Sequence, residues 1–193
     1  MLKNFMLVLV AIAIIGTIVV YFLPTSYTVS HSIEINKPAD VVYAQLNDFN
    51  KWASWSPWME ADPEAKVTVE GTPGTLGHKM SWVGKKSGTG SMTLSASSTN
   101  QFVNCDLAFI KPGKTTGKVK FQLEGNGDKT KVTWTNSGGL AFPAGRVFGL
   151  FVGKMLGGDQ VKGLEKLKNL VESLPAPTPS ASEVDTTIVA KGM

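Results

Sequence analysis

The sequence has few of the side chains that most often carry out chemistry. Among its 193 residues there are one cysteine, Cys105, and two histidines, His31 and His78. A single cysteine excludes an internal disulfide bond, and we see no metal-ligand spacing of His, Cys, Asp and Glu. Arg146 is the one arginine among 19 basic residues, whereas nucleic-acid binders rely on arginine for bidentate contacts. Despite the net charge of +4, we therefore expect no nucleic acid, no metal and no cofactor.

One long apolar segment lies near the N-terminus. Residues 5–23 carry no charge, and a helix of that length reaches roughly 28 Å, close to the ~30 Å hydrocarbon core of a bilayer. Tyr21 and Phe22 lie at its end, where membrane helices carry aromatic residues, and Pro24 then stops the helix. Signal-peptide apolar regions are shorter and end at small residues. The segment therefore favours an uncleaved transmembrane anchor over a cleaved signal peptide.

The distribution of positive charge predicts the orientation of this anchor. Lys3 and the amino terminus precede the apolar segment, and no Lys or Arg follows it until Lys37. The positive-inside rule then places residues 1–4 in the cytoplasm and the following chain outside. We expect a single-pass protein of the inner or cytoplasmic membrane of a bacterium, with a linker at 24–26 and a periplasmic domain at 27–174. Residues 175–193, which begin with a Pro- and Ser-rich stretch, are expected to be a disordered tail.

Most of the chain between the anchor and residue 140 alternates between apolar and polar residues, as half-buried strands do. The expected strands are 27–35, 66–70, 77–83, 90–97, 101–110, 117–124 and 130–137, and the expected short helices are near 38–46 and 49–55. Short loops between successive strands indicate antiparallel pairing. The alternation gives the sheet one apolar face and one polar face. Lysines cluster on the polar face of the later strands, which fits either a solvated surface or contact with anionic lipid headgroups.

The last expected helix, 143–174, has two different halves. The second half carries one apolar stripe with a polar back. The first half is apolar almost all round and has a glycine at every fourth position, Gly145, Gly149, Gly153 and Gly157. Each glycine costs a helix about 1 kcal/mol relative to alanine, so the row indicates close approach of another group. The helix either packs tightly on the sheet or forms, with its first half, one wall and the mouth of an apolar cavity.

Three tryptophans, Trp52, Trp55 and Trp58, follow one another at a spacing of three. In a helical turn they share one side. This spacing fits a packed corner of the core, and it also fits an aromatic rim around a pocket entrance.

The order of one strand, two short helices, six strands and a long helix resembles the helix-grip fold of START-like domains. Residues 32–42 (SIEINKPADVV) resemble the first strand and the start of the next helix, Asn47-Asp48-Phe49 with the tryptophans resembles the second-helix signature, and 131–135 resembles the last strand. Together they resemble bacterial SRPBCC proteins of the polyketide cyclase/dehydrase and lipid-transport type over 27–174. The resemblance implies an α+β fold, with an antiparallel sheet around the long helix and an apolar cavity between them. It does not imply one reaction.

The expected function is that of a membrane-anchored binding or carrier domain for a hydrophobic small molecule or lipid. We assign no catalytic residue: His78 and His31 share the parity of inward residues but have no partnered carboxylate, and His78 is the remaining candidate. Two alternatives stay open, a cyclase- or hydrolase-like enzyme and a structural or interaction domain whose cavity its own side chains fill. The sequence identifies no protein partner. The expected ligand-binding residues are Trp52, Trp55, Trp58, Met80, Trp82, Met92, Leu94, Cys105, Leu107, Phe121, Trp134, Phe148, Gly149, Val152 and Gly153.

Overall fold

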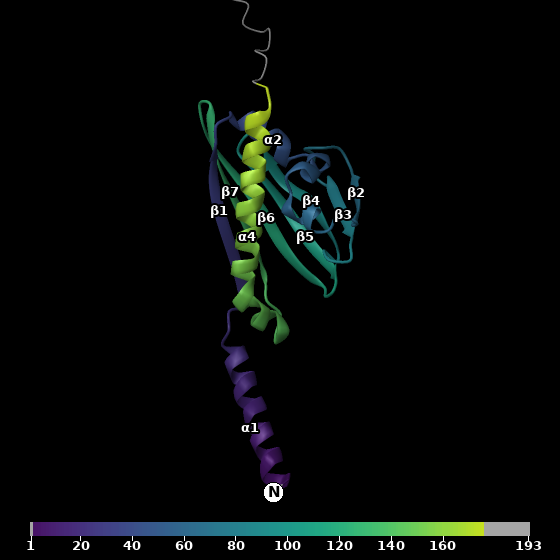
Figure 1. Cartoon of the computed structure of the whole chain (residues 1–193), viewed down its shortest axis with the longest axis vertical. Coiled ribbons are helices and arrows are strands. Elements are labelled where there is room, and N and C mark those ends of the chain that lie inside the picture. Colours follow the sequence, from purple (N-terminus) through teal and green to yellow (C-terminus); the bar gives the residue numbers. More distant parts are fainter. Residues whose placement is uncertain (1, 176–193) are drawn as a thin grey trace, which may run out of the picture.

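A computed structural model describes residues 2–175 (Figure 1). An N-terminal helix, α1 (Leu2–Tyr21), leads into a domain in which one sheet packs against a long C-terminal helix, α4 (Ala144–Ser173). Three short helices, α2 (Ala39–Leu46), η1 (Phe49–Ser54) and α3 (Pro57–Ala61), separate the first strand from the others. The strands are β1 (Ser26–Ile35), β2 (Lys66–Glu70), β3 (Lys79–Val83), β4 (Thr89–Ser98), β5 (Phe102–Lys111), β6 (Thr115–Asn126) and β7 (Lys129–Gly139).

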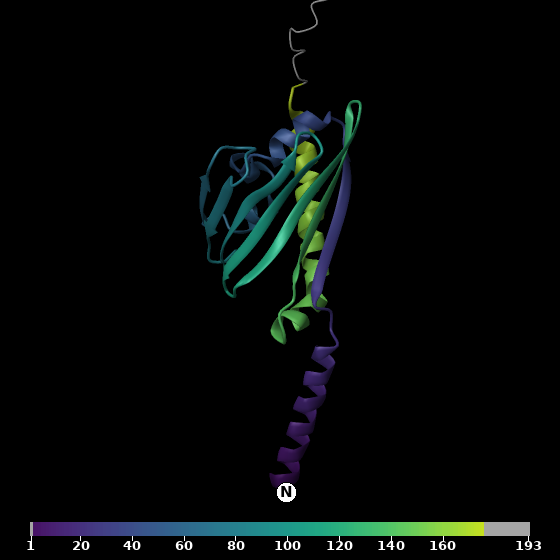
Figure 2. The same cartoon turned by 180° about the vertical axis from the view of Figure 1, so that it is seen from behind.

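The seven strands form one antiparallel sheet in the order β1-β7-β6-β5-β4-β3-β2. The sheet curves around α4, which packs mainly on β1 (Figure 2). The period of two decides which side chains face the helix: Val119, Phe121 and Leu123 of β6 are buried, whereas Lys120 between the first two is exposed and Gln122 between the last two is partly exposed. The helix-grip α+β fold expected from the sequence is therefore confirmed.

The tryptophan-rich segment closes one side of the core. Trp52 and Trp55 are buried, and their ring centroids lie 4.7 Å apart. Trp55 meets Trp134 edge to face at 5.8 Å, and Phe121 packs beside both. These two tryptophans thus form a packed corner of core. The short helix α3 was not predicted, although Pro57 stands at its first turn, where proline is preorganised for a helix.

Close packing explains three of the four glycines in the α4 row. A Cβ at Gly149 would lie 2.4 Å from Cδ1 of Leu140, and one at Gly157 would lie 3.1 Å from Cε1 of His31. Gly145 likewise faces the backbone of Leu140. A Cβ at Gly153 would meet no atom within 4 Å. The row therefore lets the β7–α4 loop and β1 approach the helix backbone, and only Gly153 faces open space.

The N-terminal helix stands apart from the domain (Figure 1). None of its residues is buried, and it is the one helix among residues 2–175 that is long and apolar enough to cross a membrane. Residues 22–25 connect it to β1, and Thr25 is held in place because its carbonyl accepts a hydrogen bond of 2.8 Å from the amide of Leu140. The expected disordered tail lies outside the described residues, apart from residue 175.

Candidate functional site: an apolar cavity under the sheet

The concave face of the sheet bounds a partly open cavity of about 180 Å³. Residues from all seven strands form its floor, η1 and α3 cover it, and Leu156 is the contribution of α4. Eight of the 17 lining residues are aromatic or methionine, and these side chains give a large, adaptable apolar surface. The lining residues are Tyr27, Trp52, Ser56, Trp58, Met59, Asp62, Ala65, Val67, Met80, Trp82, Ser87, Met92, Leu107, Phe109, Val119, Asn136 and Leu156.

The structure separates the residues expected to bind ligand into three groups. The first group lines the cavity and comprises Trp52, Trp58, Met80, Trp82, Met92 and Leu107. The second is buried in the packed core without lining the cavity and comprises Trp55, Leu94, Cys105, Phe121 and Trp134. The third lies on the first half of α4 and also does not line it: Phe148, Gly149, Val152 and Gly153. The binding role stays a prediction for the first group, and the placement of the other nine gives it no support.

The position of α4 explains the third group. Leu140, in the loop before the helix, fills the space over Gly149, so no void is left on that side. Val152 is buried, whereas Phe148 is about half exposed, and neither lines the cavity. The glycine-rich half of α4 is therefore a packed and partly exposed surface, and the wall of the cavity begins one turn later, at Leu156.

Asn136 is a polar residue of the cavity that the sequence reasoning missed. Only 4% of it is exposed, and its side-chain oxygen Oδ1 has no hydrogen-bond partner within the described structure. Buried amide groups nearly always have partners, because an unmade hydrogen bond costs about 1–3 kcal/mol. A signal was available: Asn136 has the inward parity of Val132 and Trp134 on the same strand. The cavity thus offers one amide in a mostly apolar wall.

Asp62, at the edge of the cavity, is engaged by the turn between β3 and β4. Its Oδ2 accepts hydrogen bonds from the amides of Lys86 and Ser87, at 2.9 and 2.8 Å, and from the Ser87 hydroxyl at 2.8 Å. The bonds from Ser87, and then that from Lys86, hold the pKa of this carboxyl below its ordinary value. The Asp62 carboxylate therefore fixes the turn and is poorly suited to take up a proton as a general base.

Trp58 and Tyr27 place two further polar atoms near the cavity. The indole N–H of Trp58 donates to the carboxylate of Asp159 at 3.2 Å, which fixes the ring that covers the cavity. The Tyr27 ring packs over Gly138, where a Cβ would lie 2.8 Å from its Cε1. Burial raises the pKa of the Tyr27 hydroxyl, so this group is a neutral hydrogen-bonding phenol at neutral pH.

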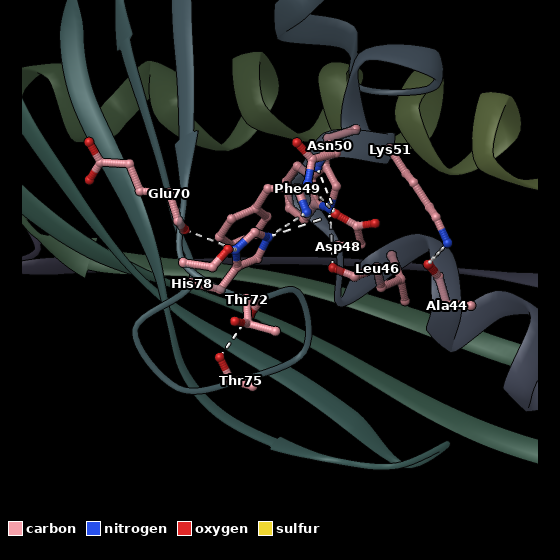
Figure 3. Close-up of polar contacts among 12 residues, drawn as sticks. Ala44, Leu46, Asp48, Phe49, Asn50, Lys51, Glu70, Thr72, Thr75 and His78 are labelled. Carbon is pink, nitrogen blue, oxygen red and sulfur yellow. Dashed lines mark hydrogen bonds and ion pairs between the residues drawn. The ribbon is translucent and has the colours of Figure 1, made fainter.

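His78, the remaining catalytic candidate, has a structural environment and does not line the cavity. Figure 3 shows its imidazole between the backbone of Glu70 and that of Phe49. The Phe49 amide donates to Nε2 at 3.1 Å, so Nδ1 carries the proton and donates to the Glu70 carbonyl at 3.0 Å. The ring also stacks on Phe49, with 4.8 Å between centroids. Contrary to the expectation of no partnered carboxylate, Oδ1 of Asp48 lies 3.8 Å from Nε2. Both nitrogens are nevertheless engaged by backbone groups outside the cavity, which leaves neither for proton transfer to a ligand in it.

The other sparse reactive groups are also built into the core. His31 Nδ1 lies 2.8 Å from Oε1 of Gln160, whose amide nitrogen donates to the carbonyls of Val29 and Trp134. This network ties α4 to β1 and β7. Cys105 is buried, and burial together with the neighbouring charge of Asp106 raises the pKa of its thiol to about 12. The thiol is therefore protonated at neutral pH and is a poor nucleophile.

A sequence model described as "Polyketide cyclase / dehydrase and lipid transport" matches residues 26–172. The chain belongs to this family. The match covers the sheet, the short helices and nearly all of α4, and the family suggests that its members bind hydrophobic small molecules. No curated protein matched the sequence.

Several solved structures of other proteins have the same fold as this member of the polyketide cyclase and lipid-transport family. A protein from Mesorhizobium loti matches 77% of this chain and 99% of its own, at a TM-score of 0.58 and 16% identity. The Aha1 dimer from Colwellia psychrerythraea matches 76% of this chain and 97% of its own, at a TM-score of 0.55 and 19% identity. A protein from Chromobacterium violaceum matches 75% of this chain and 96% of its own, at a TM-score of 0.53 and 16% identity. Identities this low establish the fold and leave the ligand to be argued from the cavity.

Proposed function

We propose that this protein is a membrane-anchored binding domain for a small hydrophobic molecule or the end of a lipid chain. The observation that carries the proposal is the mostly apolar cavity under the sheet with Asn136 in its wall, whose buried amide oxygen has no hydrogen-bond partner among residues 2–175. Apolar surface removed from water contributes about 25 cal/mol per Å², and the amide supplies a point of orientation. Binding sites for small molecules commonly combine these two features.

The size of the cavity limits the ligand. At about 180 Å³ it resembles an apolar cavity of ~150 Å³ that takes up benzene, and it is smaller than the roughly 300–1,000 Å³ of drug-sized sites. A ligand of one or two rings, or a terminal acyl segment, fits this space. A hydroxyl or carbonyl group on such a ligand would meet the Asn136 amide, which has both a donor and an acceptor.

The groups beside the cavity favour binding over catalysis. Acid–base chemistry needs a proton donor and a proton acceptor aimed at the same ligand. The Asp62 carboxylate is occupied by Lys86 and Ser87, and Tyr27 is a neutral phenol. His78 is engaged at both nitrogens elsewhere in the core. The described residues thus hold a ligand without offering it a paired acid and base.

Retention of a natural ligand tests the binding function. The full chain is purified from its membrane in a mild detergent, and native mass spectrometry with solvent extraction identifies what remains bound. Met92, which is 4% exposed and lines the cavity, is replaced by Trp to fill the space. Thr93→Val, on the opposite face of the same strand, is the matched control. We expect an apolar molecule on the native chain and on Thr93→Val, and at least roughly tenfold less on Met92→Trp, since overpacking excludes the ligand.

Two results of this experiment would contradict the proposal. Equal retention by Met92→Trp would place the molecule elsewhere on the protein. An empty native chain that also takes up no fluorescent fatty acid would favour a structural domain whose cavity stays dry.

The same proposal places the N-terminus in the cytoplasm and the domain outside. It is supported by the exposed apolar helix α1 and by Lys3 before it. Because Cys105 is buried, cysteines introduced elsewhere can be labelled selectively. In spheroplasts, a membrane-impermeant maleimide is expected to label Lys114→Cys and to reach Asn4→Cys only after lysis. The opposite pattern would reverse the topology, and release of the domain without α1 would identify a cleaved signal sequence.

A further inference from the structure

The first half of α4 and the loop before it form an exposed apolar surface beside the end of α1. Figures 1 and 2 both place the start of α4 next to the junction between the anchor and the domain. Large apolar side chains in water usually mark a binding surface when they are contiguous. Six of them are between 41% and 65% exposed here: Phe142, Val147, Phe148, Leu150, Phe151 and Met155.

Contacts of Arg146 join this surface to the anchor. Its guanidinium donates a hydrogen bond to the carbonyl of Tyr21, the last residue of α1. The same group lies 5.6 Å from the centre of the Tyr21 ring and 5.4 Å from that of Phe142. An arginine stacked on aromatic rings is typical of the headgroup level of a bilayer, where a charge stays hydrated beside apolar rings. The apolar surface is thus continuous with the point at which the anchor leaves the membrane.

The register of the sheet brings basic hairpins to the same end. Ser26, at the start of β1, pairs with Gly139 at the end of β7. The start of β6 and the end of β5 lie at the same end of the sheet, and the 112–114 turn connects them. Thr89 pairs with both Val83 and Lys111, so the 84–88 turn lies at this end too. The charge there is mainly positive: Glu64 is paired with Lys85 at 3.2 Å, and Asp62 is held in its turn. The exposed lysines of the two turns and their flanks are Lys85, Lys86, Lys111 and Lys114.

From these observations we propose that the anchor end of the domain is a second membrane contact, which lies on the surface of a bilayer containing anionic phospholipids. The inference rests on the proposed function in one respect, the insertion of α1 into the same bilayer. The phenylalanines and leucine of α4 enter the boundary between headgroups and acyl chains, as the apolar faces of interfacial helices do. The lysines of the two turns meet anionic headgroups, and each contributes roughly a fivefold change in surface partitioning.

A fluorophore that reports its surroundings tests this contact on the full chain. The label is attached to Phe151→Cys, which replaces a side chain that is 65% exposed. Asn169→Cys is the matched control on the same helix, about 27 Å further along, and Ile12→Cys reports the anchor. The proteins are reconstituted in vesicles of phosphatidylethanolamine and phosphatidylglycerol, and quenching by lipids with a spin label on the acyl chain is measured.

We expect the Phe151→Cys label to be quenched several-fold more strongly than the Asn169→Cys label. Lys111→Glu with Lys114→Glu is expected to reduce that quenching several-fold in these vesicles and to have little effect in phosphatidylcholine alone. An unquenched label at Phe151→Cys beside a strongly quenched Ile12→Cys label would overturn the second contact and leave the anchor intact. A Phe151→Cys label that is shielded from water but not quenched by the lipids would mean that a second copy covers the surface. That result would also overturn the second membrane contact. Quenching at Phe151→Cys with none at Ile12→Cys would support the contact and refute the anchor.

Discussion

Replacing Asn136 by leucine is expected to change stability and binding in opposite directions. The side chain is 4% exposed, and its amide oxygen has no partner in the described structure. A buried unpaired polar atom costs about 1–3 kcal/mol, and leucine has nearly the same shape without that cost. Position 136 also favours an apolar residue, because its cross-strand partners are Val29 of β1 and Val119 of β6. We therefore expect Asn136→Leu to raise the free energy of unfolding by about 1–2 kcal/mol.

For a domain of this size, such a gain corresponds to an increase of roughly 2–8 °C in the midpoint of thermal unfolding. Circular dichroism of the full chain in detergent measures it. Ligand binding is expected to weaken, because a hydrogen bond worth about 0.5–1.5 kcal/mol is lost, which corresponds to an increase of roughly twofold to twelvefold in the dissociation constant. Binding is measured by titration with the molecule that co-purifies with the native chain.

Asn104→Leu is the matched control. Its side-chain oxygen is also buried and without a partner in the part of the chain that the structure describes, but it lies on β5 and does not line the cavity. It is expected to leave the dissociation constant within about twofold. If Asn136→Leu instead lowers the unfolding midpoint and binds ligand as tightly as the native chain, the amide has a structural role, and the argument for an oriented ligand fails.

Three further predictions concern His78, two glycines of α4 and Asp62. His78→Ala is expected to lower the free energy of unfolding by about 2–4 kcal/mol, measured by chemical denaturation, while ligand affinity stays within a few-fold because the imidazole packs in the core; loss of a measured turnover would instead restore a catalytic role. Gly153→Ala is expected to stabilise α4 by about 0.5–1 kcal/mol, because a Cβ there meets no atom within 4 Å. Gly163→Ala is expected to destabilise the domain by about 1–2 kcal/mol, because a Cβ there would lie 2.8 Å from Trp134. Equal shifts in the thermal unfolding midpoint would contradict this packing. The lowered pKa of Asp62 gives stability that is present above the unfolded pKa of about 4 and is lost as pH falls through the folded pKa, so Asp62→Asn is expected to flatten the acid limb of a stability–pH curve, and an unchanged limb would refute the role of this carboxylate.

The strands were predictable because one face of the sheet is buried. Val119, Phe121 and Leu123 alternate with the polar residues Lys120 and Gln122, and a shift of one residue would exchange the two faces. The boundaries of β2 were predicted correctly, and those of the other strands within one or two residues. The segment after Trp55 was less predictable, because α3 has only five residues and its pattern is too short to show a helical period.

The cavity was harder to predict than the core, because both lie on the same face. Met92 and Leu94 share a strand and a direction, and both are buried, yet only Met92 lines the cavity. Which of them faces a void depends on the volumes of side chains from η1, α3 and α4, which are distant in sequence. Leu140 over Gly149 is a similar case, because the path of a loop decided that the first half of α4 has no void. For Asn136, parity alone predicts an inward side chain, but its place in the cavity wall depends on the same packing.

The linker of four residues between Tyr21 and Ser26 sets the range over which the domain acts. An extended chain spans at most about 3.5 Å per residue, so these residues allow an excursion of roughly 14 Å, and the hydrogen bond from Leu140 to Thr25 shortens it further. On the proposed topology the domain cannot travel between two membranes as a soluble shuttle does. Its search for ligand is two-dimensional, by lateral diffusion in one leaflet, and any onward transfer requires a recipient that comes to the same membrane.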